Sequence, residues 1–231
     1  MKTVGIIGGI GPESTVEYYE MILAGCREQR PEDDPPSILI NSVNLKKLIR
    51  LFEAGEYAAV AEYLGGEVQR IAKAGADFGL LSANTPHVVF DEIQRQSPIP
   101  LVSIVQATCD EAKAQGLKKV GLFGTRFTMQ GRFYPDVFSR AGIIIVVPNE
   151  SEQAYIHDKY LNELLKSKFL PETRAQLLAI AKRMTQQDAI EALILGGTEL
   201  PLILRDSEEE HVPFLDTTQI HVKSIVAGLL A

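Results

Sequence analysis

The chain has 231 residues, enough for one large domain or two smaller ones with buried cores. Apolar residues make up 45% and charged residues 23%, proportions typical of a soluble globular protein. The net charge of −7 argues against a nucleic-acid partner, because binding phosphates needs clustered Lys and Arg. The longest apolar runs are about seven residues, too short to span a membrane.

The chain begins without a secretory signal pattern, so we expect a cytoplasmic protein. The two cysteines, Cys26 and Cys109, lie in helix-like segments, and we expect buried thiols and no disulfide. The histidines show no metal-ligand spacing with each other or with the cysteines, and we expect no metal. They are His87, His157, His211 and His221.

The first part of the chain predicts buried strands alternating with helices. Strands are expected over 3–8, 37–42, 78–81 and 102–104, and helices over 13–27, 45–52 and 57–74. Pro12 suits the first turn of the first helix, where a missing N–H costs nothing. Regular alternation of this kind predicts parallel sheets in an α/β fold.

The second half of the chain repeats this plan. The strand-like run Val120 to Gly124 mirrors Val4 to Gly8. Each run is followed, at nearly the same distance, by a second strand that ends in small residues, at Ala83 and at Gly197. We therefore predict two similar parallel-sheet α/β lobes. Residues 1–102 plus 212–231 form the first and residues 103–211 the second, with a last helix over 217–230.

Small and polar residues follow four of the predicted strands. In open parallel sheets, ligands bind beyond the carboxyl ends of the strands. Two lobes that face each other would place all four strand ends around one cleft, where we expect the binding site. The four segments begin at Gly8, Ala83, Gly124 and Gly197.

The glycine-rich turn at Gly8 and Gly9 first suggests a nucleotide loop. The dinucleotide fingerprint needs a sixth-position glycine, where this chain has Ser14, and an acidic residue after the second strand, which ends at Ser42. A nucleotide-dependent oxidoreductase is therefore disfavoured. Two interpretations remain for Gly8 and Gly9: a tight strand-to-helix turn, or N–H groups that hold a small carboxylate.

Polar side chains at the other strand ends are candidates for binding an amino acid. Asn84, Thr85 and Thr198 can bind its carboxylate or ammonium group, and Glu199 can accept from the ammonium. Thr125 can donate to a carboxylate or cap the helix that follows it. The structural alternative for Thr198 and Glu199 is the start of a short helix that ends near Leu204.

Four segments together resemble the aspartate/glutamate racemases, which are amino-acid racemases. They are Val4–Gly9 with Glu13–Thr15, Ala83–His87, Gly121–Arg126 with Thr128–Met129, and Gly196–Glu199 with Phe214–Thr217 and Ile220–His221. The segments span nearly the whole chain in the family's order, and the joint match is specific. The resemblance implies two α/β lobes with pseudo-twofold symmetry, an interlobe active site, no pyridoxal phosphate, no metal, and a homodimer.

The chain departs from the family at its two acid/base positions. The family places a cysteine from each lobe on either side of the substrate Cα, and here those positions hold Ala83 and Gly197, which cannot exchange protons. Three explanations stay open: an engineered inactive form, a natural non-catalytic binder, or an enzyme with other acid/base groups. His87 and Glu199 lead on chemistry as alternatives, because an ordinary hydroxyl is a poor base. The hydroxyl candidates are Ser82, Thr85 and Thr198.

An acidic substrate would need a cation for its side-chain carboxylate. Lys46 follows the second strand, after Asn44, where the resemblance places a specificity residue. Lys47, Arg50, Lys166 and Lys168 are further candidates, and the alternative for all of them is a solvated surface. The sequence thus predicts a cofactor-independent racemase of the aspartate/glutamate type, or else a protein that binds an amino acid or dicarboxylate without turning it over.

Overall fold

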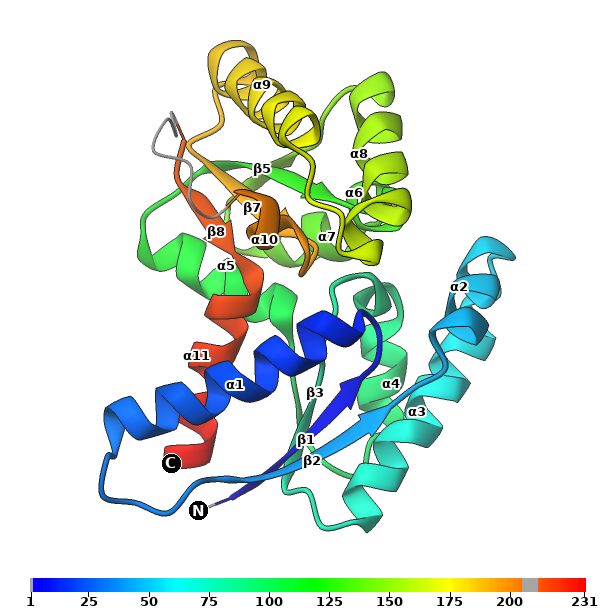
Figure 1. The fold of residues 1–231 in the computed structure, drawn as a ribbon, viewed down its shortest axis with the longest axis vertical. Helices are drawn as coiled ribbons and strands as arrows, with labels where there is room; N and C mark the ends of the chain where they lie inside the picture. Colours follow the sequence, from blue (N-terminus) through cyan, green and yellow to red (C-terminus); the bar gives the residue numbers. More distant parts are fainter. Residues whose placement is uncertain (1, 205–211) are drawn as a thin grey trace. The chain divides into compact units, whose positions relative to one another are not determined.

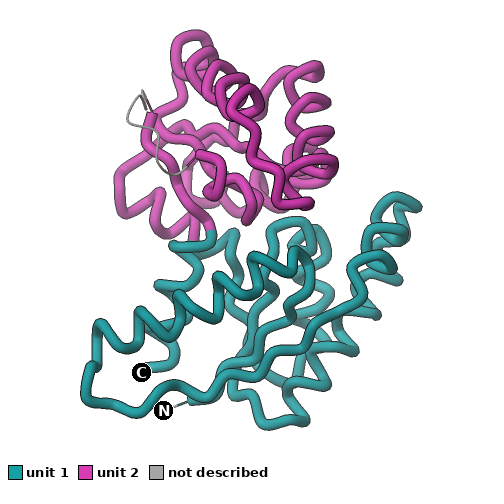
Figure 2. Tube along the Cα trace, in the orientation of Figure 1, with its two compact units in different colours: residues 1–107, 218–231 teal, residues 108–217 magenta. Residues whose placement is uncertain are grey.

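The computed structural model describes residues 2–204 and 212–231. The chain forms two compact units: Met1–Ala107 with Thr218–Ala231, and Thr108–Thr217 (Figure 2). Each unit contains a four-stranded sheet in which every pairing is parallel. The prediction of two similar parallel-sheet α/β units is confirmed.

The first unit is built on strands β1 (Thr3–Gly8), β2 (Ser37–Ser42), β3 (Phe78–Leu81) and β4 (Leu101–Val102), in the order β2-β1-β3-β4. The register aligns the carboxyl ends, with Gly8 opposite Ser42 and Ile7 opposite Leu81. Its helical segments are α1 (Pro12–Gln29), α2 (Leu45–Glu53), α3 (Tyr57–Lys73), the 3₁₀ turn η1 (Thr85–Val89) and α4 (Phe90–Gln96) (Figure 1). Helices α5 (Ile104–Ala114) and α11 (Thr217–Leu230) each begin close to a boundary between the units.

Alternate side chains of β1 and β3 pack against helices on the two faces of the first sheet. Val4 and Ile6 join residues of α1 and α11 in one buried apolar cluster. Gly5 and Gly79 lie under Ile71 of α3, and a Cβ built on Gly5 would lie 2.5 Å from Ile71 Cδ1. Glycine at this position therefore lets helix α3 approach the sheet closely. Each fully buried apolar side chain here contributes roughly 1.5–3 kcal/mol.

The second unit repeats this topology with strands β5 (Lys119–Gly124), β6 (Ile144–Val146), β7 (Ala192–Gly196) and β8 (Phe214–Asp216), in the order β6-β5-β7-β8. Gly124 lies opposite Gly196, so the carboxyl ends of the two central strands are level. The further segments are α6 (Arg126–Gln130), α7 (Phe133–Arg140), α8 (Glu150–Asn162), η2 (Leu164–Lys166), α9 (Pro171–Asp188) and α10 (Leu200–Leu204).

Helices α8 and α9 cover one face of the second sheet. Phe123 of β5 and Leu195 of β7 pack with Ile156 of α8 and Leu177 of α9 in one buried cluster. Helix α8 starts at a capping box, in which the Asn149 side chain accepts from the N–H of Glu152 and the Glu152 side chain accepts from the N–H of Asn149. This cap fixes where α8 begins and so orients the side chains that α8 presents to the sheet.

The division expected from sequence, 1–102 plus 212–231 and 103–211, stays a prediction beside the two compact units of the structure. Close to the first boundary, the N–H of Ile104 donates to His87 Nε2. Close to the second, β8 pairs with β7 and the Thr217 hydroxyl donates to Leu195 O at 2.8 Å.

Most predicted elements have the expected bounds. Strands over 3–8, 37–42 and 78–81 and the last helix over 217–230 agree to the residue. The strand expected over 102–104 lies at Leu101–Val102, because helix α5 already begins at Ile104. Within the described part of the chain, no helix is both long and apolar enough to cross a membrane.

Candidate active-site clusters at the carboxyl ends of the two sheets

The glycine turn after β1 is packed tightly against the start of helix α1. Gly9 has a φ of +75°, which favours glycine, and its N–H donates to Thr15 Oγ1 at 2.9 Å. A Cβ built on Gly8 would lie 2.4 Å from Thr15 Cγ2. These contacts favour the tight-turn interpretation, because the Gly9 N–H already has an acceptor within the protein.

The end of β3 lies beside this turn. Ser82 is fully buried, and its hydroxyl donates to Ile7 O at 3.2 Å and lies 3.5 Å from Thr15 Oγ1. Two hydroxyls, from α1 and from the turn after β3, therefore meet at the carboxyl end of the first sheet. Asn84, which is also buried, starts the 3₁₀ turn η1, and Thr85 follows it half-buried.

Ala83 is buried at the position that the resemblance gives to the first thiol. The residue next to it in space is His87, whose Nδ1 lies 3.0 Å from Ala83 O. Since Ile104 N–H donates to His87 Nε2 at 3.3 Å, the hydrogen-bond pattern assigns the ring proton to Nδ1. The ring also stacks on Phe90, with centroids 4.8 Å apart.

These contacts hold His87 as a neutral ring. Its burial and, next, the nearby His221 lower its pKa to about 3. Both ring nitrogens are used to join the turn after β3 to the start of α5. The geometry therefore favours a structural function for His87 over the base considered from sequence.

The end of β2 carries the predicted cation cluster. Asn44 caps helix α2, with its Oδ1 accepting from Lys47 N at 3.0 Å, and its own N–H donates to the Tyr63 hydroxyl at 2.9 Å. The Lys47 ammonium lies 4.0 Å from the centre of the Tyr63 ring. Lys46 is exposed, and its carbonyl accepts from Arg50. Lys166 and Lys168 are exposed in the second unit.

In the second unit, Thr125 caps helix α6 at the end of β5. Its Oγ1 accepts from Thr128 N and lies 3.3 Å from Thr128 Oγ1. A Cβ built on Gly124 would lie 2.7 Å from Gly196 O and 2.8 Å from Thr128 Cγ2. The cap expected as an alternative for Thr125 is therefore present, and Gly124 is required by the close approach of β7 and α6.

The position that the resemblance gives to the second thiol is filled by another residue. A Cβ built on Gly197 would lie 2.4 Å from Tyr160 Cε2 and 2.7 Å from the Tyr160 hydroxyl. Tyr160 comes from helix α8, and only 5% of it is exposed. The ring of Tyr160 thus occupies the space that a side chain at position 197 would need.

Tyr160 belongs to a buried hydrogen-bonded cluster with the two residues after Gly197. The Tyr160 hydroxyl donates a short hydrogen bond to Glu199 Oε2, and the Thr198 hydroxyl donates to the same oxygen at 3.0 Å. Thr198 and Glu199 are each 2% exposed. Burial, and then the charge of Glu199, raise the pKa of Tyr160 well above its usual value. The carboxyl group of Glu199 therefore accepts hydrogen bonds from two hydroxyl groups in a site sheltered from water.

The structure groups the predicted site residues into two sets, each at the carboxyl end of its own sheet. The set in the first unit consists of Gly8, Gly9, Asn44, Lys46, Ala83, Asn84, Thr85 and His87. The set in the second unit consists of Thr125, Gly197, Thr198 and Glu199. Sequence reasoning gave no function to Thr15, Tyr63 or Tyr160. The glycine at 197 is consistent with a neighbour that fills the space, but the sequence does not indicate that this neighbour is Tyr160.

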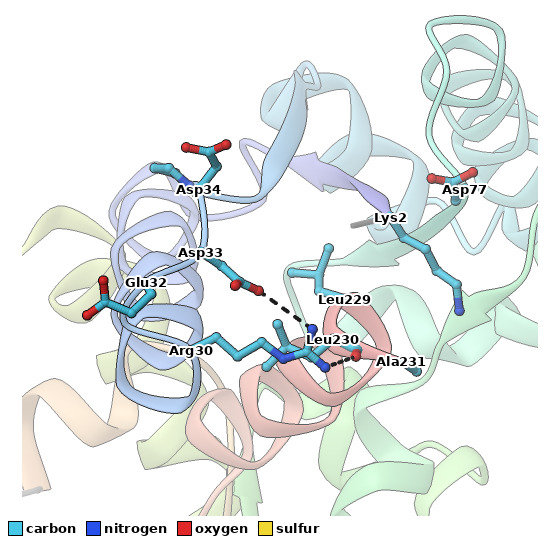
Figure 3. A pocket seen from close by; sticks show the side chains of 10 residues that line it. Lys2, Arg30, Glu32, Asp33, Asp34, Asp77, Leu229, Leu230 and Ala231 are labelled. Atoms are coloured by element: carbon cyan, nitrogen blue, oxygen red, sulfur yellow. Dashed lines mark hydrogen bonds and ion pairs between the residues drawn. The ribbon is translucent and has the colours of Figure 1, made fainter.

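One hollow of the first unit lies away from these residues. It measures about 820 Å³ and is lined by Lys2, Arg30, Asp77 and the chain end Leu229–Ala231, among others (Figure 3). Lys2 and Asp77 directly precede β1 and β3, so the hollow lies at the amino end of the sheet. It is open and polar, and it contains none of the predicted site residues. Within the described ranges, no group of three His, Cys, Asp or Glu side chains is arranged to hold a metal ion.

Comparisons with known proteins agree with the fold and identify a family. A family model described as Asp/Glu/Hydantoin racemase matches residues 7–225. The broad specificity amino-acid racemase RacX of Bacillus subtilis is 26% identical over 99% of this chain and 98% of its own length. An aspartate racemase homologue from Pyrococcus horikoshii superposes with a TM-score of 0.84 and 32% identity over the whole of both chains. A Yersinia pestis protein proposed to be an Asp/Glu racemase gives 0.91 and 29%, also over both whole chains.

Proposed function

Because the chain belongs to the Asp/Glu/hydantoin racemase family, we propose that it is an amino-acid racemase of the aspartate/glutamate type that uses neither a cofactor nor the family's two thiols. The observation that supports this most is the buried Glu199 cluster at the carboxyl end of the second sheet. It keeps an ionisable carboxylate beside Gly197, where the family has an acid/base group.

The chemistry requires a proton to leave Cα on one face and a proton to arrive on the other. Ala83 has no exchangeable proton, and His87 uses both ring nitrogens in contacts within the protein. Glu199 is thus the leading base among the sequence candidates. Shelter from water strengthens its interaction with a bound substrate, because charges interact more strongly at low dielectric.

Substrate binding is assigned to the polar residues around these positions. Asn84, Thr85 and Thr198 carry donors and acceptors that suit an amino-acid carboxylate and ammonium group. Lys46, exposed at the start of α2, is the proposed partner of a second carboxylate on an acidic substrate. The proposed ligand is therefore a small amino acid or dicarboxylate.

A second candidate function is supported by the first unit. There the thiol position is an alanine, and the nearest ring, His87, has a pKa lowered to about 3 by burial. A chain with no proton-transfer group on that side could bind an amino acid without inverting it. This alternative is a non-catalytic binding protein on the racemase scaffold.

Hydrogen–deuterium exchange at Cα separates the two functions. Both enantiomers of aspartate and glutamate are incubated with the protein in D₂O and followed by NMR. The racemase predicts exchange above buffer, with a loss of about 100-fold or more in Glu199→Gln, since general acid–base catalysis contributes about 10²–10⁴-fold. Glu172→Gln, an exposed change on α9, is the matched control. Saturable binding without exchange would instead identify a binding protein.

The proposal includes two finer expectations about the protein's state. We propose that it is a cytoplasmic homodimer, as expected from sequence. Light scattering coupled to size-exclusion chromatography measures the mass directly, and a mass near the 25.4 kDa of one chain would contradict the dimer.

A further inference from the structure

Only glycine fits at position 197, because the Tyr160 ring occupies the space of a side chain there. Its φ is not in the left-handed region that favours glycine, so the backbone itself accepts other residues. The exclusion comes from the ring: the built Cβ would lie 2.4 Å from Cε2 and 2.8 Å from Cζ of Tyr160. The phenolic oxygen, 2.7 Å from that Cβ, lies where the first side-chain atoms of a residue at 197 would lie.

The phenol also carries a proton and has a partner able to take it. Its hydroxyl donates to Glu199 Oε2, and Thr198 donates to the same oxygen at 3.0 Å. The three side chains are buried, so this hydrogen bond is sheltered from competing water. Helix α8 supplies the phenol and the segment after β7 supplies the carboxylate, which makes the pair a tertiary contact within the second unit.

We propose that Tyr160 replaces the missing thiol of the second unit as the group that exchanges the proton with substrate Cα, and that Glu199 stores that proton. The inference rests on the proposed racemase function and deepens it. It assigns the proton-transfer atom to Tyr160 Oη, and it gives Glu199 a supporting function through the phenol.

The step balances without an oxidant or a second reactant. The Cα–H bond of the substrate breaks and its electron pair stays on the substrate, stabilised as an enolate of the carboxyl group. The released proton forms a new O–H bond on Tyr160, while the original phenol proton moves along its hydrogen bond to Glu199 Oε2. The reverse transfer returns a proton to the same face of Cα and so accounts for exchange at Cα, whereas inversion also requires a proton to arrive on the opposite face. A tyrosinate beside a carboxylate is never formed, which matters because burial opposes it.

The inference changes how a thiol could be restored at position 197. Gly197→Cys alone would clash with the Tyr160 ring. The cysteine fits only when Tyr160 is shortened, as in Gly197→Cys with Tyr160→Ala. The thiol and the phenol are therefore alternative occupants of one position.

The test compares Cα exchange in four proteins: wild type, Tyr160→Phe, Glu199→Gln and the control Tyr155→Phe. Tyr160→Phe keeps the ring over Gly197 and removes only the hydroxyl. Tyr155 lies on the same helix, half-buried, beside Lys159. Exchange is measured by NMR in D₂O for each enantiomer of aspartate and glutamate, and substrate binding is measured in the same samples.

We expect Tyr160→Phe and Glu199→Gln each to lose about 100-fold or more of the exchange rate while substrate binding is kept, with Tyr155→Phe unchanged. Loss in Glu199→Gln with full exchange in Tyr160→Phe would overturn the inference and leave the racemase function standing. Absence of exchange in the wild type would overturn both, since the chain would then transfer no proton.

A second measurement covers the case in which Tyr160→Phe fails to fold. Incorporating 3-fluorotyrosine at position 160 makes the phenol more acidic with little change in size. The rate of exchange at Cα then changes if the phenol transfers the proton, because the rate of proton transfer follows the acidity of the transferring group. An exchange rate equal to that of the wild type would overturn the inference, because a purely structural ring would leave the rate unchanged.

Discussion

The packing of Tyr160 over Gly197 predicts that even one added methyl group is costly. In Gly197→Ala the new Cβ would lie 2.4 Å from Tyr160 Cε2, whereas carbon atoms in contact lie roughly 3.5–4.0 Å apart. The ring or the backbone must therefore move by about 1 Å in a close-packed region. Overpacking of this kind costs about 1–3 kcal/mol. For a chain of this size each kcal/mol lowers Tm by about 2–4 °C, so we expect a fall of about 2–12 °C.

A double-mutant cycle with Tyr160→Leu identifies the source of this cost. Thermal unfolding followed by circular dichroism and calorimetry gives the stability of the wild type, both single variants and the double variant. If the ring causes the clash, the alanine costs less in the Tyr160→Leu background, with a coupling of about 1 kcal/mol or more. Equal costs in the two backgrounds, or a Gly197→Ala protein as stable as the wild type, would refute the steric argument.

Three further predictions concern stability away from this cluster. Gly66→Ala, in the middle of α3 with nothing within 4 Å of a built Cβ, should stabilise by about 1 kcal/mol, through the higher helix propensity of alanine. Burial lowers the pKa of His87 to about 3 and of His221 to about 4, so the unfolded chain binds more protons between these values and about 6.5. At pH 5.5 the free energy of unfolding should therefore be lower, by about 1.4 kcal/mol for each histidine, than it is well above pH 6.5. Arg183→Lys should cost about 1 kcal/mol by losing the two-atom pairing with Glu152.

Each of these outcomes has its own check. Gly66→Ala is measured beside Gly197→Ala, and a loss of stability in the former would contradict the open space around it. For the histidines, denaturant unfolding is followed from pH 7.5 to 4.5, and His87→Gln should flatten the slope below pH 6.5. If His87→Gln and the wild type have the same slope, the pKa of His87 is not lowered in the folded protein. Arg183→Lys is compared with the exposed Arg27→Lys, and equal stabilities would refute the pairing argument.

The strand and helix pattern was predictable because it depends on local chemistry. Strands β1, β2 and β3 and helix α11 lie at the predicted residues, since buried apolar runs and helical periodicity are visible along the chain. Gly8 and Gly124 marked strand ends in the sequence, and the structure adds that neighbouring segments approach them closely. The short strands β6 and β8 were less predictable, because their positions depend on pairing with β5 and β7.

The candidate site was only partly predictable. Glu199 and the positions Ala83 and Gly197 could be proposed from sequence, because they follow strands in recognisable motifs, and their function stays a prediction. His87 was expected as a candidate base, but the tertiary structure places both its nitrogens in hydrogen bonds that bridge η1 and α5. The second partner of that bridge, Ile104, is remote in sequence, so no local pattern could indicate it.

By itself the sequence determined that this chain forms two like α/β units, belongs to a racemase family and lacks thiols at Ala83 and Gly197. These properties can be recognised from the identity of the residues and their spacing along the chain. The tertiary structure alone decided which side chain fills the space beside Gly197. Tyr160 lies 37 positions before Gly197 on a different element, and only the packing of α8 against β7 brings its hydroxyl to Glu199. Contacts of this kind depend on three-dimensional packing, which the order of residues along the chain does not display.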